Sequence, residues 1–110
     1  MSNFVVYQVS LELIDALRDP VATIRTHDRN LADQLQRAST SVVLNIAEGR
    51  RRVGRDRRQH FLVSLGSAGE VGAALDVALG WRYMSQESLA REIGLADRVR
   101  ALLWGLLHGE

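Results

Sequence analysis

Apolar side chains recur at steps of three and four residues in four successive segments of the chain. This spacing places them on one side of an α-helix, and no segment alternates apolar and polar residues as a half-buried strand would. The pattern predicts helices over approximately residues 3–24, 30–49, 56–80 and 86–108. Helices of about twenty residues joined by short connections pack antiparallel to their neighbours. We therefore predict an all-α fold, an antiparallel up-down four-helix bundle in which residues 1–110 form a single domain.

The apolar stripe of the second segment is the most regular, with steps of four, three, four and four residues: Leu31, Leu35, Ala38, Val42 and Ile46. The stripe of the first segment consists of Phe4, Tyr7, Leu11, Ile14, Val21 and Ile24, and additional valines widen its start. The third and fourth stripes are Phe61, Leu65, Ala68, Gly72, Leu75 and Leu79, and Leu89, Ile93, Ala96, Val99, Leu103 and Leu107. We expect these stripes to meet in the core of the bundle.

Residues near the segment ends indicate where the helices begin and end. Pro20 lacks an amide donor and crowds the preceding turn, so we expect it to kink or end the first helix. Asp28 or Asn30 can cap the second helix, and Gly49 suits the position just past its end, where a left-handed backbone costs glycine little. Ser85 is the expected N-cap of the fourth helix.

The third segment contains three interior glycines, Gly66, Gly69 and Gly72. Each costs a helix about 1 kcal/mol relative to alanine, so their presence needs a reason. Close approach of a neighbouring helix is the reason we favour. We expect that neighbour to lie in the same bundle for some of the glycines and in another subunit for others, and the sequence does not divide them.

Composition restricts the class of protein. A chain of 110 residues that is 46% hydrophobic suits one globular domain. It has no cysteine, which excludes disulfides, thiolate metal sites and thiol catalysis. No basic leader precedes an apolar run, and no stretch approaches the roughly 18 uninterrupted apolar residues of a membrane span. We expect a cytoplasmic protein without a membrane partner.

Positive charge is concentrated in one short stretch, "RRRVGRDRR" at residues 50–58. Its six arginines and one aspartate give +5, whereas the other eight arginines and twelve acids give −4, so the chain as a whole carries +1. The antiparallel arrangement would gather these arginines at one end of the bundle. The candidate nucleic-acid contacts are Arg50, Arg51, Arg52, Arg55, Arg57 and Arg58.

Two interpretations of this arginine run stay open. Arg57 and Arg58 stand near a helix N-terminus, which prefers anions, and guanidinium groups bind phosphate bidentately, so nucleic-acid backbone is one candidate partner, either RNA or DNA. Alternatively, the arginines only solvate a helical hairpin, and Arg50 to Arg52 gain from the negative end of their own helix dipole. No aromatic residue lies within the run, so no base-stacking surface is predicted.

A second group of polar residues spans the second and third helices: Arg37, Ser41, Asn45, Glu48, Ser67 and Glu70. A ferritin-like dimetal centre needs a Glu-x-x-His pair, and that spacing does not occur among them. We expect instead a structural network in which Glu48 or Glu70 pairs with Arg37 or caps backbone groups.

No catalytic, metal or cofactor site is predicted. His27, His60 and His108 are widely separated and are expected at the surface. The chain has no nucleophile elbow, glycine-rich phosphate loop or paired acid motif. We therefore expect a protein that is not an enzyme.

Two stretches resemble a known family, "LADQLQRASTSVVLNIAEG" and "FLVSLGSAGEVGAALDVA". The chain is similar there to the four-helix-bundle proteins encoded in intervening sequences of bacterial 23S ribosomal RNA genes. The matching positions are Leu31, Gln34, Leu35, Arg37, Ala38, Ser41, Asn45, Ile46, Ala47, Glu48 and Gly49, then Gly66, Ser67 and Glu70. The resemblance implies an antiparallel bundle that assembles as a ring-like homopentamer.

The resemblance implies less about function. A more distant relative is the accessory protein of diversity-generating retroelements, whose basic surface engages nucleic acid and a reverse transcriptase. The family often has an aromatic or small residue after "NIAEG", whereas this chain has Arg50, so the arginine run has to be argued from its own chemistry. Our hypothesis is a non-enzymatic oligomeric adaptor that binds nucleic-acid backbone. The alternatives are a scaffold that binds a protein partner and, more remotely, a bundle that binds a metal or small molecule.

Overall fold

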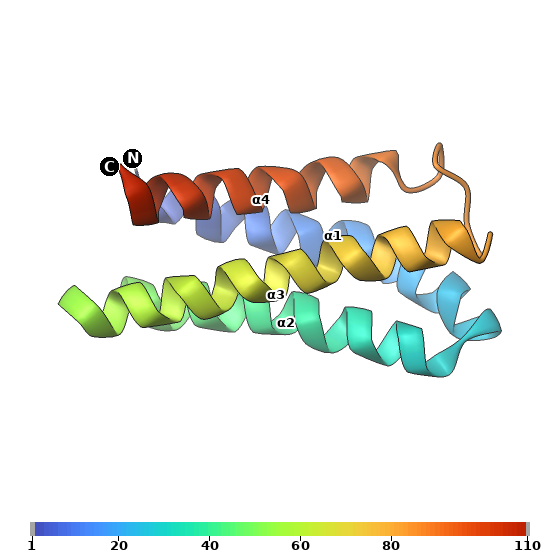
Figure 1. Ribbon diagram of the computed structural model, residues 1–110, viewed down its shortest axis with the longest axis horizontal. Helices are drawn as coiled ribbons and strands as arrows, with labels where there is room; N and C mark the ends of the chain where they lie inside the picture. Colours follow the sequence, from blue (N-terminus) through green and yellow to red (C-terminus); the bar gives the residue numbers. More distant parts are fainter. Residues whose placement is uncertain (1, 110) are drawn as a thin grey trace.

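The computed structural model describes residues 2–109, so the two end residues of the predicted 1–110 domain lie outside the described part. This part of the chain forms four helices. They are α1 (Asn3–His27), α2 (Arg29–Arg50), α3 (Gly54–Gly80) and α4 (Ala90–His108). Each helix packs on the next, and α4 also packs on α1. Figure 1 shows the four rods running up and down, with α1 and α4 on one side and α2 and α3 on the other. The predicted all-α fold of four helices is confirmed, with no strand in residues 2–109.

The buried residues confirm the apolar stripe predicted for the second helix and differ from the stripe predicted for the first. The whole α2 stripe is buried, and α1 instead buries a set shifted around the helix: Val6, Val9, Leu13, Leu17 and Ile24. Phe4 and Leu11, which we expected inside, are 49% and 43% exposed. Because α1 carries apolar residues on two adjacent stripes, spacing alone favoured neither, and the helix turns toward its neighbours the stripe that contains Leu13.

Pro20 does not end α1, which was one of the two outcomes predicted for it, a kink being the other. The helix continues to His27, and Pro20 itself is buried. Pro20 cannot donate a hydrogen bond to the carbonyl of Ala16, four residues earlier, and its ring crowds that carbonyl, but the helix continues on both sides of it. Burial of Ile24 beyond the proline helps to hold the following turns against the core.

Asp28 joins α1 to α2. Its backbone N–H donates to the Ile24 carbonyl at 2.8 Å, and its carboxylate accepts from the Leu31 N–H at 2.9 Å. The same residue therefore ends one helix and caps the next, which selects Asp28 over Asn30 among the two predicted caps.

Gly49 has a different role from the predicted one. It lies inside α2, which ends at Arg50, and a Cβ added there would come within 2.5 Å of the Phe61 ring. The glycine therefore allows α3 to approach α2 closely. The left-handed backbone occurs instead at Gly54, the first residue of α3, where φ is 60°.

The start of α4 also differs from the prediction. The helix begins at Ala90 rather than at residue 86, and Leu89 occupies its N-cap without a side-chain hydrogen bond. Ser85 instead accepts the Ser88 N–H at 3.1 Å in the turn before the helix. Ser85 therefore stabilises the turn that precedes α4 and is not the N-cap of the helix.

The outward side of α3 is open at its glycines. In the described part of the chain, no atom outside the helix lies within 4 Å of the position that a Cβ would take at Gly66, Gly69 or Gly72. The expectation that some of them admit a helix of the same bundle is therefore wrong.

By length and composition, α3 could also cross a membrane. In the bundle it packs between α2 and α4 and buries Phe61, Ala68 and Leu75, and the core helix of a bundle has the same apolar composition.

Candidate nucleic-acid interface

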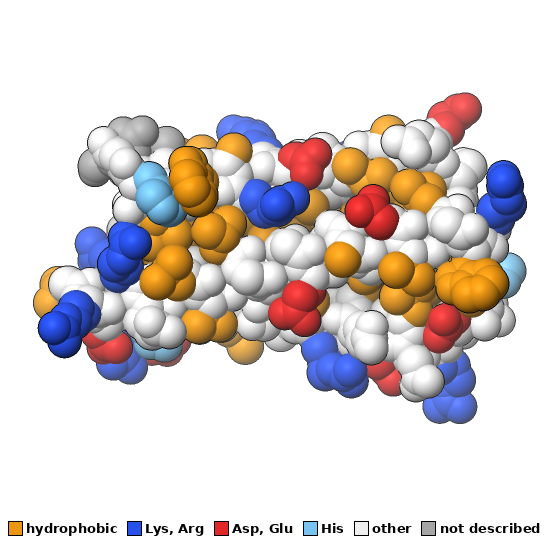
Figure 2. Space-filling model, in the orientation of Figure 1, with side chains coloured by type: hydrophobic (Ala, Val, Ile, Leu, Met, Phe, Trp, Pro, Cys, Tyr) orange, Lys and Arg blue, Asp and Glu red, His pale blue; other side chains and the backbone are white. Residues whose placement is uncertain are grey.

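The α2–α3 turn, defined here as residues 50–58, gathers six arginines at one end of the bundle. Both chain termini lie at this same end (Figure 1). Figure 2 shows basic side chains projecting from it. The six side chains divide into three that contact other helices or their carbonyl groups and three that are exposed on the turn.

Arg50 packs across α1. Its guanidinium lies over the rings of Phe4 and Tyr7, at 5.2 and 5.0 Å from their centres, and its Nε donates to Asn3 Oδ1 at 3.2 Å. Such cation–π contacts stabilise the pair by about 0.5 to 1 kcal/mol at exposed sites. Arg50 therefore ties the end of α2 to the start of α1.

Arg57 and Arg58 bind the carbonyl ends of two helices. Arg57 donates to the carbonyls of Gly49 and Arg50 at 3.0 and 3.1 Å, and Arg58 donates to the Leu107 carbonyl at 2.8 Å. Both cations thus donate to carbonyl groups in the last turn of a helix, where the dipole also favours positive charge. The sequence argument placed them against the dipole of α3, and their contacts remove that argument for an anionic partner.

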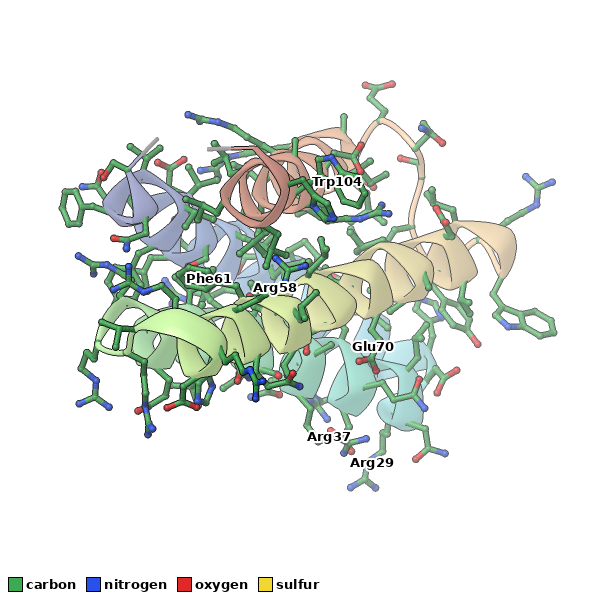
Figure 3. The ribbon with its side chains drawn as sticks, turned by 60° about the vertical axis from the view of Figure 1, so that its left-hand side comes forward. Arg29, Arg37, Arg58, Phe61, Glu70 and Trp104 are labelled. Carbon is green, nitrogen blue, oxygen red and sulfur yellow. The ribbon has the colours of Figure 1, made fainter. Side chains whose placement is uncertain are left out.

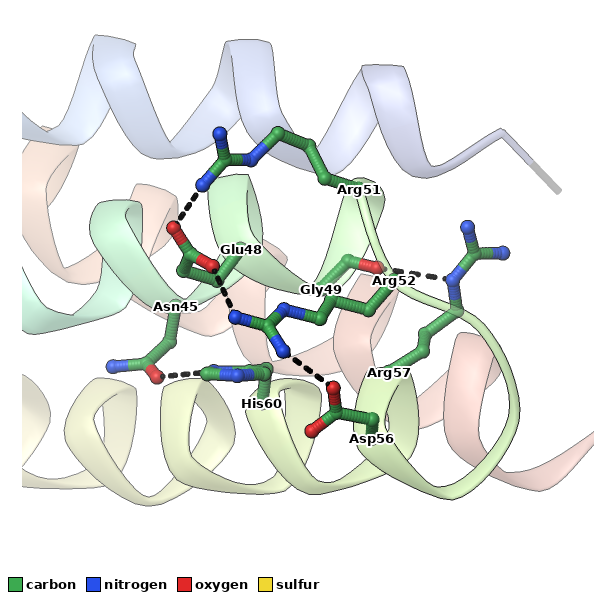
Figure 4. Close-up of polar contacts among 8 residues, drawn as sticks. All are labelled: Asn45, Glu48, Gly49, Arg51, Arg52, Asp56, Arg57 and His60. Atoms are coloured by element: carbon green, nitrogen blue, oxygen red, sulfur yellow. Dashed lines mark hydrogen bonds and ion pairs between the residues drawn. The ribbon is translucent and has the colours of Figure 1, made fainter.

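Arg51, Arg52 and Arg55 are exposed on the turn. Figure 4 shows Glu48 accepting hydrogen bonds from Arg51 and from Arg52, while Arg52 also donates to Asp56 at 2.6 Å. Arg55 makes no hydrogen bond or ion pair with residues 2–109.

Glu48 is the acid at the centre of this cluster. The hydrogen bonds from Arg52 and Arg51 hold the pKa of the Glu48 carboxyl below its usual value. Asp56 offsets one of the six arginines and leaves the turn with five net positive charges, and Glu48 beside the turn offsets one more.

Part of the predicted polar network forms between α2 and α3. The Ser41 and Ser67 hydroxyls are hydrogen-bonded at 2.8 Å, and the Asn45 amide donates to the Ser41 carbonyl at 3.0 Å. Asn45 Oδ1 also lies 3.1 Å from Nδ1 of His60, a residue expected at the surface and found half-buried. The sequence missed this contact because it depends on the register between the two helices.

Arg37, Glu48 and Glu70 stand apart from that network. Glu48 joins the arginines of the turn, as described above. Arg37 and Glu70 line a groove of about 550 Å³ between α2 and α3, together with Ser41 and Ser67. Both are exposed, on neighbouring helices (Figure 3), and form no ion pair within residues 2–109.

Each histidine has an aromatic or polar neighbour. His27 stacks on Tyr83 and His108 on Trp104, with ring centres 4.9 and 3.6 Å apart. Within the described residues, no three histidine or acidic side chains are placed to hold a metal ion.

Comparison with known proteins supports the fold and the family. A crystal structure of a protein of unknown function from the S23 ribosomal protein family of Bacteroides thetaiotaomicron superposes with a TM-score of 0.88 at 20% identity, covering 94% of this chain and 98% of that one. No curated protein matches the sequence significantly. Residues 2–105 match the family described as 23S rRNA-intervening sequence protein. Because that match spans nearly the whole sequence, the chain belongs to the 23S rRNA-intervening sequence protein family.

Proposed function

We propose that this protein is a non-enzymatic, oligomeric adaptor whose α2–α3 turn contacts the phosphate backbone of RNA or DNA. The observation that carries the proposal is the exposure of Arg51, Arg52 and Arg55 on a turn with five net positive charges. Guanidinium groups form charge-assisted, bidentate hydrogen bonds with phosphate oxygens.

The fixed arginines support the exposed ones. Arg50 and Arg57 anchor the turn to α1 and to the end of α2, and they retain their charge while doing so. A rigid turn loses less conformational freedom when it binds, which favours affinity. No aromatic side chain belongs to residues 50–58, so contact with phosphate rather than with bases is the mode that this chemistry supports.

The oligomer is the second part of the proposal. Among residues 2–109, no atom outside α3 lies within 4 Å of the Cβ positions of the glycines on its outward side, and the apolar residues Leu62, Val77 and Trp81 are 39%, 43% and 69% exposed. A second copy of the chain is the occupant we propose, and the family resemblance suggests a homopentamer. A closed ring would repeat the α2–α3 turn on each subunit and raise avidity for a polyanion.

A protein-interaction scaffold is the alternative function. The exposed apolar side chains on α3 favour it, since they suit a protein partner as well as a second copy. In that case the arginines of the turn would serve only to join the helices and to solvate one end.

Binding of single-stranded RNA and duplex DNA at two salt concentrations tests the proposal. The variant Arg51→Gln/Arg55→Gln removes exposed charge and leaves the carbonyl contacts of Arg57 and Arg58 in place. We expect the slope of log affinity against log salt to become shallower by about one for each arginine lost from phosphate contact.

The matched control is Arg29→Gln/Arg98→Gln, which removes the same charge from exposed positions outside the turn. It should retain the affinity and salt slope of the unmodified protein. Equal weakening in both variants would show a diffuse charge effect. Absence of binding at low salt would exclude the nucleic-acid role and favour the scaffold.

A further inference from the structure

Trp104 places an exposed aromatic ring at the arginine end of the bundle. It lies near the end of α4 and is 58% exposed, and its ring stacks on that of His108, with ring centres 3.6 Å apart and an angle of 18° between the planes. Nδ1 of His108 lies 3.1 Å from the Trp104 carbonyl oxygen, so the histidine is held against the backbone as well as against the ring. Residues four apart share a side of a helix, which brings the two rings together. The pair forms a short aromatic stack at the protein surface.

Arg58 connects this stack to the α2–α3 turn. Its guanidinium reaches from α3 to α4 and donates to the carbonyl of Leu107, which stands between Trp104 and His108 in the sequence. Figure 3 shows Arg58 and Trp104 on these neighbouring helices. Arg58 is exposed, and a guanidinium that donates one hydrogen bond keeps further N–H donors for phosphate. A phosphate-binding group and a stacking surface therefore lie at the same end of the protein.

Arg100 adds a cation one helical turn before Trp104. It is exposed and stands four residues from Trp104, so it shares the side of α4 that carries the ring. Its Nη1 atom is 3.9 Å from Oδ1 of Asp97, which is too far for a hydrogen bond. Along the axis of α4, the exposed ring thus lies between the contact made by Arg58 and the side chain of Arg100.

We propose that the Trp104–His108 stack receives an unpaired base of single-stranded nucleic acid, while the neighbouring arginines bind its phosphates. This inference rests on the proposed function, because the α2–α3 turn supplies most of the phosphate contacts, and it adds a substrate class, single strands in preference to duplex. A duplex can offer phosphates to the turn, but its bases are already paired and stacked. Stacking on an exposed ring is tolerant of sequence, since every base has a π-face. The aromatic ring that residues 50–58 lack is supplied by α4.

Binding of the full chain to three labelled probes of equal length tests this inference. The probes are an oligothymidylate strand, a strand of the same backbone with abasic sites in place of most bases, and duplex DNA. Trp104→Leu keeps an apolar side chain and removes the π-face. It should weaken binding to oligothymidylate about five- to a hundredfold and leave binding to the other two probes unchanged. Its salt slope should equal that of the unmodified protein, because stacking releases no counterions.

Three further measurements separate stacking from a loss of structure. Trp104→Phe retains a ring and should keep most of the affinity for oligothymidylate. Leu44→Ala is the matched control, since it removes an exposed apolar side chain from α2 and should bind all three probes as the unmodified protein does. In a Trp81→Phe background Trp104 is the only tryptophan, and oligothymidylate should quench its fluorescence whereas the duplex should not. Circular dichroism and light scattering establish the fold and the molar mass of each variant.

The failures of the two proposals are distinguishable. Equal affinity of Trp104→Leu and the unmodified protein for oligothymidylate would overturn the base contact and leave the phosphate contact of the turn intact. Absence of binding to any probe at low salt would overturn both. If Trp104→Leu had a lower molar mass and bound all three probes more weakly, the ring would belong to a subunit contact, which would also overturn the base contact.

Discussion

The contact between α2 and α3 and the outward side of α3 both contain glycine, but the space around the glycines differs. At Gly49 the Phe61 ring occupies the place of a side chain, whereas no atom outside α3 approaches the positions of Gly66, Gly69 and Gly72. A glycine inside a helix costs about 1 kcal/mol in either region. Packing of Phe61 compensates for that cost at Gly49, and no contact among residues 2–109 does so at the three outward glycines. Gly94 of α4 has similar open space, so it is the grouping of three such glycines on α3 that fits the proposed contact with a second chain.

We expect Phe61→Ala to cause the largest loss of stability, because it removes the side chain that packs against Gly49 in the contact between α2 and α3. Phe61 is 4% exposed, and truncation of a buried phenylalanine destabilises a fold by about 3–5 kcal/mol. Denaturant unfolding followed by circular dichroism measures the loss. Leu44→Ala, at a position of α2 that is 59% exposed, should change the free energy of unfolding by less than about 0.5 kcal/mol. Similar losses in both variants would show that Phe61 is not a principal core contact.

The triple variant Gly66→Ala/Gly69→Ala/Gly72→Ala tests whether the outward side of α3 contacts a second chain. Three added methyl groups raise intrinsic helix stability by about 2–3 kcal/mol, but they would obstruct a subunit packed on this surface. We expect the molar mass from light scattering to fall toward the 12.3 kDa of one chain while the helical signal is retained.

Gly94→Ala controls for the intrinsic gain, since Gly94 of α4 also has open space around it. This variant should be more stable by about 1 kcal/mol and unchanged in mass. A triple variant that is more stable and also unchanged in mass would place the subunit contact elsewhere or remove it.

The sequence predicted correctly those features of the fold that follow from the spacing of apolar residues. The α2 stripe from Leu31 to Ile46 is buried as its spacing requires, and the number and order of the helices follow from four such segments. The prediction was wrong where two solutions satisfied the same pattern, as in α1, whose Phe4 and Leu13 stripes are both apolar. The role of Gly49 was missed because the clash that excludes a side chain comes from Phe61, in another helix.

Prediction from the sequence was limited in a similar way at the arginine run of the candidate nucleic-acid interface. Sequence position identified all six arginines and their common end of the bundle. It could not show that Arg57 reaches back to the end of α2, or that Arg58 reaches α4, because a guanidinium extends several ångströms from its own backbone.

Gly49→Ala tests the inner contact with a single methyl group. The added Cβ would lie 2.5 Å from the Phe61 ring, so the core must shift. Overpacking costs about 1–3 kcal/mol and the gain in helix propensity offsets part of it, so we expect a net loss of about 1–2 kcal/mol in the free energy of unfolding. The double variant Gly49→Ala/Phe61→Leu should show favourable coupling, with a loss smaller than the sum of the single losses. Additive losses would mean that the two residues do not compete for the same space.

We expect Glu48→Gln to have the smallest effect on stability. Glu48 lies at the polar edge of the contact between α2 and α3. The hydrogen bonds from Arg52 and Arg51 lower the pKa of Glu48 in the folded protein, so its contribution to stability is complete above the ordinary glutamate value of 4.5 and is lost as the pH falls through the lowered folded value. The melting temperature of the unmodified protein should therefore exceed that of Glu48→Gln near neutral pH, and the difference should shrink as the pH is lowered past that value. Glu70→Gln, which removes an exposed acid without an ion pair in the described residues, should not reproduce this pattern. If it did, the pH dependence would come from the overall charge of the chain, and Glu48 would hold the arginines of the turn without stabilising the junction of α2 and α3.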